Sequence, residues 1–169
     1  MLKDAIKILK SGGVVAFPTE TVFGIGASIK FPAAIKRIYR IKKRPKNKPL
    51  QILVANLEQA KKLGKFNKKA LELSQEGWPG PLTLVVYKKN SRSKIGLRVP
   101  AHKTVLALIK KCGPIAATSA NTSGEKPALT AEEVKEKLPQ VDYVLPGKVK
   151  LGRASQVIDT TKGIKILRS

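Results

Sequence analysis

Hydrophobic residues recur at helical spacing, every three or four positions, in six segments of the chain. The first segment begins at Leu2 and ends before Gly12-Gly13, because glycine is a poor helix former. The second opens at Pro32 and runs until Pro45, which cannot continue a helix. The other helices are expected from about Asn56, from about Asn67, around residues 105–109, and from Thr130, which forms a capping box with Glu133, to Leu138.

Short apolar runs between these segments predict β-strands. They cover residues 14–17, 50–54, 82–87, 97–99, 115–117, 143–145, 156–159 and 164–167. No internal repeat, low-complexity tract or linker interrupts the chain, so we expect residues 1–169 to form a single domain. The uneven alternation of helices and strands predicts an α/β fold with one twisted, mixed sheet covered by helices.

The charge balance adds a second signal: 34 Lys and Arg residues stand against 11 Asp and Glu residues, a formal net charge of +23. Such an excess favours polyanionic partners, either nucleic acid or polyphosphate ligands. A lysine-rich proteome or adaptation to heat would also produce it, although thermophilic proteins usually gain Glu together with Lys. Charge alone therefore leaves the function open.

Residue types that mark other protein classes are scarce. The single cysteine permits no internal disulfide, and with a single histidine it argues against a zinc site built from the protein alone. No apolar run approaches the roughly 20 residues that a transmembrane helix needs. Residues 1–7 alternate charged and apolar side chains, which is unlike a signal peptide. We therefore expect a cytoplasmic protein without a membrane partner.

The common nucleotide-binding and catalytic motifs are incomplete. Gly24-Ile25-Gly26 lacks the third glycine of a dinucleotide fingerprint. Gly147 and Gly152 have P-loop spacing, but Arg153-Ala154 stands where Lys-Ser/Thr is required. A Ser-His-Asp triad could use only His102, which we interpret as a surface or packing residue.

Four clusters have a composition suited to a ligand site. Residues 18–26 place hydroxyls, a carboxylate and glycines directly after a buried strand, as expected of a ligand-facing loop. Residues 42–50 hold five cations and two prolines, which suits a rigid phosphate clamp. A tight turn and a solvated basic loop are the alternative interpretations of these two clusters.

The other two clusters also end or interrupt strands. Arg98 lies between Leu97 and Val99, so its side chain points to the opposite face from its neighbours, toward solvent or toward a carboxylate ligand. Residues 118–124 follow the strand at 115–117 and carry hydroxyls and an amide. Such groups bind phosphate oxygens through neutral hydrogen bonds, or simply form a polar turn.

Taken together, these clusters resemble the L-threonylcarbamoyladenylate synthase family, also called YrdC-like. The matching blocks are residues 13–24, 42–45, 78–83, 97–102, 118–121 and 154–159. The family signature, K-x-R followed far downstream by S-x-N, is present as Lys42, Arg44, Ser119 and Asn121. The resemblance covers nearly the whole chain, and it implies a largely parallel sheet with an open, basic, concave cavity.

The resemblance also implies an activity. Members form threonylcarbamoyl-AMP and pyrophosphate from L-threonine, bicarbonate or CO2, and ATP, with Mg²⁺ carried by the nucleotide. The product serves the modification of an adenosine beside the anticodon of certain tRNAs by downstream threonylcarbamoyl transferase machinery. Long members have an additional C-terminal domain, and we expect none here because no residues follow Ser169.

Family roles transfer to matching residues of this chain. Thr19 and Arg98 would hold threonine, and Lys42 and Arg44 would be catalytic. The expected ATP-binding residues are Lys42, Arg44, Lys48, Ser119, Asn121 and Ser155. No protein side chain is expected to bind a metal. Leu53 stands where some members have a histidine, so that threonine contact is expected to be missing.

The implied chemistry agrees with the residues present. N-carboxythreonine is already an anion, so its attack on the α-phosphorus needs charge neutralisation and alignment rather than a histidine base. Two other interpretations remain: a non-catalytic module that binds double-stranded RNA or tRNA, and a carbamoyl-transfer or hydrogenase-maturation partner. Because the cations are dispersed and aromatic residues are few, we expect only weak RNA binding without sequence preference.

Overall fold

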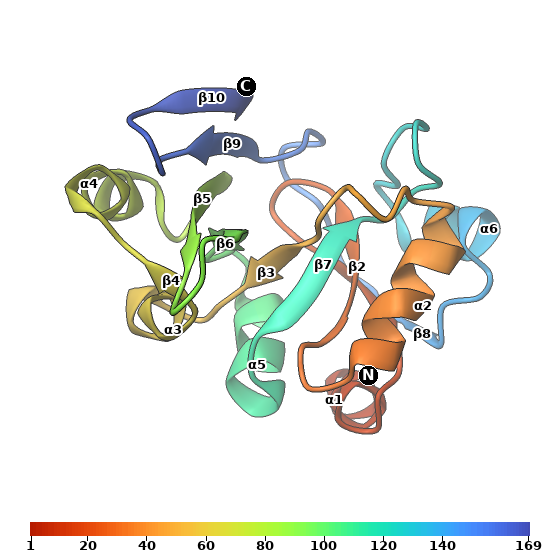
Figure 1. Ribbon diagram of the computed structural model, residues 1–169. Helices are drawn as coiled ribbons and strands as arrows, with labels where there is room; N and C mark the ends of the chain where they lie inside the picture. The colour runs from red at the N-terminus through yellow and green to blue at the C-terminus, as the bar shows by residue number, and fades with distance from the viewer.

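One ten-stranded sheet organises the molecule, and six helices pack against it in the computed structural model, which describes residues 1–169 (Figure 1). The helices are α1 (Leu2–Lys10), α2 (Pro32–Lys42), α3 (Leu57–Leu63), α4 (Lys68–Gly77), α5 (Lys103–Cys112) and α6 (Ala131–Lys137). All six were expected from the hydrophobic spacing. None of them is long and apolar enough to cross a membrane.

Asparagine and threonine caps explain where three of these helices begin. The side chains of Asn56, Asn67 and Thr130 each accept a hydrogen bond from a backbone N–H in the first turn of α3, α4 and α6. The box at α6 differs from the expected one in a single detail. The Glu133 carboxylate accepts from the N–H of Leu129, one residue before the cap, at 2.7 Å.

Strands follow the expected runs, with two additions. They are β1 (Val15–Pro18), β2 (Phe23–Ser28), β3 (Gln51–Leu53), β4 (Gly64–Lys65), β5 (Leu82–Lys88), β6 (Lys94–Arg98), β7 (Ile115–Ser119), β8 (Tyr143–Val144), β9 (Gln156–Asp159) and β10 (Lys165–Arg168). β2 and β4 were not predicted. The expected ligand-facing loop at 18–26 is therefore shorter, because its second half is a buried strand.

The strand order is β10-β9-β5-β6-β3-β7-β2-β1-β8, with β4 paired to β5. The sheet is mixed, as expected, but antiparallel pairs outnumber parallel ones. Only β1–β8, β3–β6 and β5–β9 are parallel. The reason is local: short connections join β1 to β2, β5 to β6 and β9 to β10, and a short connection produces an antiparallel hairpin.

The two halves of the sheet are covered differently. Around β1, β2 and β7, helices α2 and α6 pack on one face while α1 and α5 pack on the other. Around β5 and β6, helices α3 and α4 supply a single covered face through residues such as Ala60 and Ala70. The opposite face of this second half carries no helix, and it forms the floor of the cavity described below (Figure 1).

Along β5 and β6, side chains alternate between the hydrophobic core under the helices and the floor of the cavity. In β5, Leu84 and Val86 are buried in the apolar clusters, whereas Thr83 and Val85 line the cavity. In β6, Leu97 is buried under the helices, whereas Gly96 and Arg98 line the cavity.

Candidate functional site

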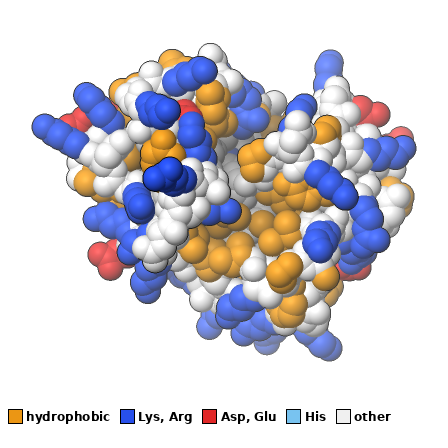
Figure 2. Space-filling view, in the orientation of Figure 1, with side chains coloured by type: hydrophobic (Ala, Val, Ile, Leu, Met, Phe, Trp, Pro, Cys, Tyr) orange, Lys and Arg blue, Asp and Glu red, His pale blue; other side chains and the backbone are white.

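A cavity of about 300 Å³ opens between the two halves of the sheet. Its lining includes four cations, Arg44, Lys94, Arg98 and Arg168, and no carboxylate. Figure 2 shows a hollow near the centre of this face, with hydrophobic side chains on its floor and lysine and arginine side chains around it. Lys94 is neutralised by Asp159, whose Oδ2 lies 2.7 Å from Nζ, so the arginines dominate the field in the cavity.

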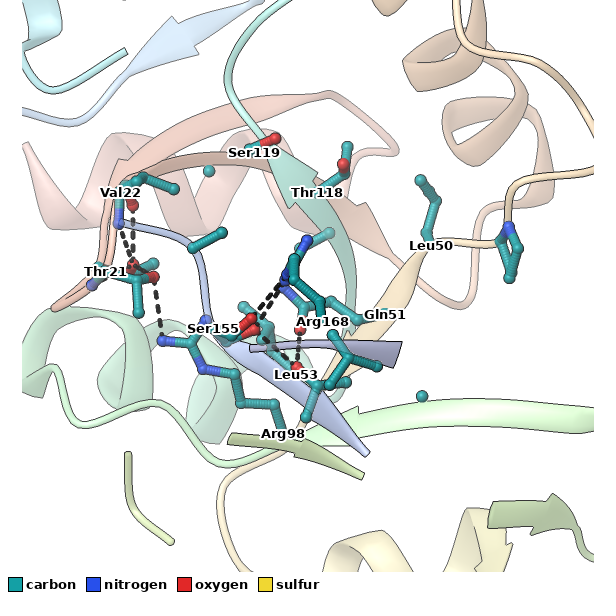
Figure 3. Close-up of a pocket in the computed structure, with 18 of the residues that line it drawn as sticks. Thr21, Val22, Leu50, Gln51, Leu53, Arg98, Thr118, Ser119, Ser155 and Arg168 are labelled. Carbon is teal, nitrogen blue, oxygen red and sulfur yellow. Dashed lines mark hydrogen bonds between the residues drawn. The ribbon is translucent and has the colours of Figure 1, made fainter. Parts of the chain in front are cut away.

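Arg98 is the most rigidly held of these arginines. It ends β6 and is almost fully buried, with an exposed fraction of 2%. Its Nη2 donates to the Glu20 carboxylate and, at 3.2 Å, to the Thr21 hydroxyl, while Nε donates to the Gly80 carbonyl at 3.1 Å. Nη1 makes no hydrogen bond within the protein, and Arg98 lines the cavity. The guanidinium therefore presents one preorganised edge to a ligand (Figure 3).

Thr19 builds the loop that carries Glu20 and Thr21. Its hydroxyl donates to the Val22 carbonyl at 2.7 Å and accepts from the backbone N–H of Thr21 at 3.1 Å. The Thr19 and Thr21 hydroxyl oxygens lie 2.7 Å apart. Thr19 does line the cavity, but its hydroxyl is already saturated by this turn.

The two glycines of the 18–26 cluster mainly allow β2 to pack closely against its neighbours, rather than allowing a ligand to approach the backbone. A Cβ on Gly26 would lie 2.6 Å from Cγ2 of Ile115, so a larger residue would push β2 away from β7. Gly24 lines the cavity, and a Cβ there would stand 3.2 Å from the Phe17 ring. Only Gly24 keeps a place in the site.

The basic segment at 42–48 is divided by the end of α2. Lys43 adopts a left-handed conformation and ends the helix, after which the chain turns back. Arg44 faces the cavity, with Nε donating to the Lys48 carbonyl at 3.1 Å and Nη2 to the Pro49 carbonyl at 3.0 Å. Lys46 and Lys48 are exposed, and Lys48 lies outside the cavity lining.

Lys42 is buried beneath the cavity instead of lining it. Its Nζ donates to the Ser119 carbonyl, to the Asn121 carbonyl at 2.7 Å and to Asn121 Oδ1 at 3.1 Å. Burial, and to a smaller extent the nearby Arg44, lowers the pKa of Lys42 to about 7. The Nζ group of Lys42 thus has three protein oxygens as partners.

The S-x-N segment completes this arrangement. Ser119 lines the cavity and its hydroxyl donates to Asn121 Oδ1 at 2.5 Å. The Asn121 amide nitrogen donates to the carbonyls of Thr122 and Glu125, at 3.0 and 2.7 Å. Asn121 is therefore a structural residue of the loop after β7, and Ser119 is the member of the pair that can meet a ligand.

Ser155 and Arg168 form another part of the cavity wall. The Arg168 side chain donates through Nε to the Ser155 carbonyl at 2.7 Å and through Nη2 to its hydroxyl at 3.1 Å (Figure 3). Ser155 Oγ lies 2.9 Å from the Thr83 hydroxyl, which in turn donates to Gln51 Oε1 at 2.7 Å. The chain of hydrogen bonds thus crosses the floor from β10 to β3.

The arginines are close enough to repel one another. The pKa of Arg168 is lowered by burial first, and then by the charges of Arg98 and Arg44. The lining contains no carboxylate that could offset this repulsion. Glu20, which lies behind Arg98, neutralises only that arginine. Such a site favours a ligand with several negative charges.

Five of the expected site residues reach the cavity: Thr19, Arg44, Arg98, Ser119 and Ser155. Lys42 and Asn121 lie directly behind it, and Lys48 lies outside. The sequence interpretation assigned no role to Arg168, Gln51 or Thr83, and it included Thr118, which also lines the cavity, only as a member of the cluster at residues 118–124. Thr83 had a detectable signal, because it is the polar residue between Leu82 and Leu84 in a strand.

Comparison with known proteins gives a consistent result. A family model named Sua5_yciO_yrdC, described as Telomere recombination, matches residues 7–169. A threonylcarbamoyl-AMP synthase of Pyrococcus abyssi is 37% identical over 98% of the chain, and the chain spans about half of that relative, 52%. A protein of the same description from Psychromonas ingrahamii is 39% identical over 80% of the chain and 77% of its own length.

A solved structure extends the comparison to three dimensions. The crystal structure of P. abyssi Sua5 complexed with L-threonine superimposes with a TM-score of 0.93 at 38% identity. The alignment covers 99% of this chain and 53% of that one.

Proposed function

Because the chain belongs to the Sua5/YciO/YrdC family, we propose that it joins L-threonine, bicarbonate or CO2, and ATP into threonylcarbamoyl-AMP with release of pyrophosphate. The observation that carries this proposal is the convergence of Arg44, Arg98 and Arg168 on one cavity whose lining has no carboxylate. This arrangement suits a reaction between two anions. A module that only binds RNA would need neither a cavity nor a buried arginine.

The proposed reaction needs little proton chemistry. A carboxylate oxygen of N-carboxythreonine attacks the α-phosphorus of ATP; the new P–O bond forms as the bond to the β-phosphate breaks, and pyrophosphate leaves with that electron pair. Repulsion between the two anions is the main barrier that a protein can lower. Arg44 and Arg168 would neutralise the phosphates, and Mg²⁺ would enter as part of the ATP substrate.

Arg98 is our candidate for the threonine carboxylate. Arg98 lines the cavity and its Nη1 makes no hydrogen bond within the protein, while Glu20, Thr21 and Gly80 fix the rest of the side chain. A guanidinium held in this way binds a carboxylate without losing further side-chain freedom. Thr19 would contribute by holding the loop that carries Glu20.

Lys42 and Asn121 are proposed as positioning residues. They tie the end of α2, two residues before Arg44, to the loop that follows Ser119, the last residue of β7. Lys48 would attract phosphate over a distance from the cavity rim. Ser119 and Ser155 would offer neutral contacts to the nucleotide.

The first test is an assay of the purified protein for pyrophosphate. We expect release to require ATP, L-threonine and bicarbonate together, because the phosphoryl acceptor exists only when threonine and CO2 have combined. Omission of each component in turn measures this dependence. Release that continues unchanged without threonine would reject the proposed reaction.

RNA binding provides a second prediction. The lysines and arginines dispersed over the face shown in Figure 2 should contact phosphates without reading bases. We expect weak tRNA binding whose log–log salt slope is about −0.7 to −0.9 per phosphate contacted. A salt titration with cognate tRNA, unrelated tRNA and a plain RNA duplex tests this. A preference for cognate tRNA that survives high salt would contradict it.

Downstream transferase machinery and a cytoplasmic location belong to the same proposal. The product is an activated carbamate, so it requires an acceptor that receives the threonylcarbamoyl group. A transferase acting on tRNA adenosine fulfils that requirement.

A further inference from the structure

A chain of four hydrogen-bonding side chains crosses the cavity floor, and its last member is Gln51. Arg168 donates to Ser155 Oγ at 3.1 Å, Ser155 Oγ lies 2.9 Å from Thr83 Oγ1, and Thr83 donates to Gln51 Oε1 at 2.7 Å. Figure 3 draws the contacts between Arg168 and Ser155 as dashed lines. All four side chains line the cavity.

The direction of these hydrogen bonds is clear at both ends of the chain. A guanidinium has no acceptor, so the Ser155 oxygen accepts from Arg168. Thr83 donates its single proton to Gln51 Oε1, so Ser155 is the donor in the 2.9 Å contact between the two hydroxyls. The Gln51 carbonyl oxygen is therefore held by Thr83.

One consequence is a free donor in the cavity. The Gln51 amide nitrogen makes no hydrogen bond within the protein, while the oxygen of the same amide is held by Thr83. The relay thus keeps two N–H groups available for a ligand oxygen.

Gln51 also lies at a defined position between the charged ends of the cavity. In the parallel pairing of β3 and β6, Gln51 lies opposite Gly96 and Leu53 lies opposite Arg98. Gln51 is therefore about 7 Å along the strand from the level of Arg98. On its other side, Arg44 donates to the carbonyl of Pro49, two residues earlier in the chain.

We propose that the Gln51 amide nitrogen binds the carbamate group of the carboxylated amino acid, an inference that rests on the proposed function. A substrate with its α-carboxylate at Arg98 and the nucleotide phosphates at Arg44 and Arg168 places its N-carboxylate between them, over Gln51. The amide donates to the oxygen that does not attack, and the other oxygen stays free for the α-phosphorus.

A neutral donor suits this position. An arginine there would bind the carbamate more strongly, but its charge would make the attacking oxygen less nucleophilic. A neutral amide orients the carbamate and leaves the attacking oxygen more nucleophilic. Leu53, the next residue on the same face of β3, also lines the cavity and has no polar atom. Within β3, Gln51 alone can provide this contact.

The test compares Gln51→Met, Gln51→Glu and Thr83→Val with the native protein. Gln51→Met keeps the length of the side chain and removes the donor, so kcat/KM for bicarbonate should fall about 10- to 100-fold, the range for a hydrogen bond to a charged group. Gln51→Glu should lower kcat/KM for bicarbonate further, because a carboxylate at this position repels the carbamate. Thr83→Val removes the hydrogen bond that holds the Gln51 amide, and it should lower kcat/KM by a smaller factor. The Kd of a non-hydrolysable ATP analogue should change less than about twofold, since the phosphates keep their arginines.

Gln75→Met and Gln75→Glu are the matched controls, because Gln75 is exposed on α4 and makes no side-chain hydrogen bond. Native kinetics in Gln51→Met would overturn the inference while leaving the proposed function intact. Equal losses of analogue binding and turnover would assign Gln51 to the nucleotide instead. The native protein is assayed first. If its release of pyrophosphate does not depend on threonine, the proposed function itself is rejected before any variant is measured.

Nuclear magnetic resonance provides a readout that does not depend on a folded variant. In the ¹⁵N-labelled native protein, the side-chain amide signal of Gln51 should shift when threonine and bicarbonate are added together with the ATP analogue. It should shift much less when bicarbonate is left out. Identical spectra with and without bicarbonate would overturn the proposal.

Discussion

Replacing Arg98 with methionine is expected to lower the free energy of unfolding by about 3–5 kcal/mol, the usual cost of breaking a buried ion pair. Arg98 and Glu20 are exposed by only 2% and 4%, so water cannot screen the charge that remains. Without the guanidinium, Glu20 would keep only local contacts for a buried carboxylate, one oxygen of which already lacks a partner. Urea denaturation followed by circular dichroism measures the change.

The double variant Glu20→Gln/Arg98→Met separates burial of an unpaired charge from loss of packing. It should recover a large part of the lost stability, because no uncompensated charge remains. Arg92→Met is the matched control, since Arg92 is exposed and makes no hydrogen bond, and it should change stability by less than about 0.5 kcal/mol. If Arg98→Met were as stable as Arg92→Met, the Glu20–Arg98 ion pair would make no net contribution to the free energy of unfolding.

Replacing Lys42 with methionine is expected to lower turnover on the order of 10²-fold and to destabilise the protein by about 2 kcal/mol. The sequence interpretation assigned Lys42 to ATP as a member of the basic segment at residues 42–50. The structure instead gives it three oxygen partners that connect α2 to the loop after β7. Loss of these bonds leaves the Asn121 carbonyl without its partner and frees Ser119 to move.

The neighbouring residue provides the control and pH provides a second readout. Lys43→Met changes an exposed side chain with no hydrogen bond and should leave both turnover and stability near native. The pKa of Lys42 is about 7 in the folded protein, below the value of about 10.4 for an unfolded lysine. Between these values the unfolded chain binds more protons, so the contribution of Lys42 to stability rises with pH across that window.

Unfolding free energies of the native protein and of Lys42→Met, measured from pH 7 to pH 10, test this sign. The difference between the two proteins should grow as pH rises. A difference that is constant, or that shrinks, would show that the buried amine keeps its proton throughout. Full activity in Lys42→Met would remove its positioning role altogether.

The fold was largely predictable because the buried residues of this chain recur with the spacing that helices and strands require. All six helices carry their apolar residues at three- and four-residue spacing, and most strands are short apolar runs. β2 was missed because Gly24 and Gly26 resemble a ligand loop, whereas in the structure they allow β2 to approach its neighbours. That missing strand also hid the β1–β2 hairpin, and with it the antiparallel majority of the sheet.

The site was predictable at the level of segments but less so at the level of side chains. The K-x-R and S-x-N segments do meet, yet which of their residues faces the cavity depends on partners far away in sequence. Lys42 and Asn121, for example, are 79 positions apart and are joined by a hydrogen bond. Arg168 was missed because the apolar run that predicted the last strand stops at Leu167, and no local pattern indicates a cavity on that side.

The position of β10 at the edge of the sheet links ligand affinity to local order. This strand pairs only with β9, through a register that shifts before Arg168, and its four residues are exposed. Arg168 reaches the cavity only while that pairing persists, so opening of the edge removes a cation from the site. An anion that binds Arg168 must therefore draw on its own binding free energy to keep the edge closed. By the same linkage, the occupied protein holds its last strand more tightly than the empty one.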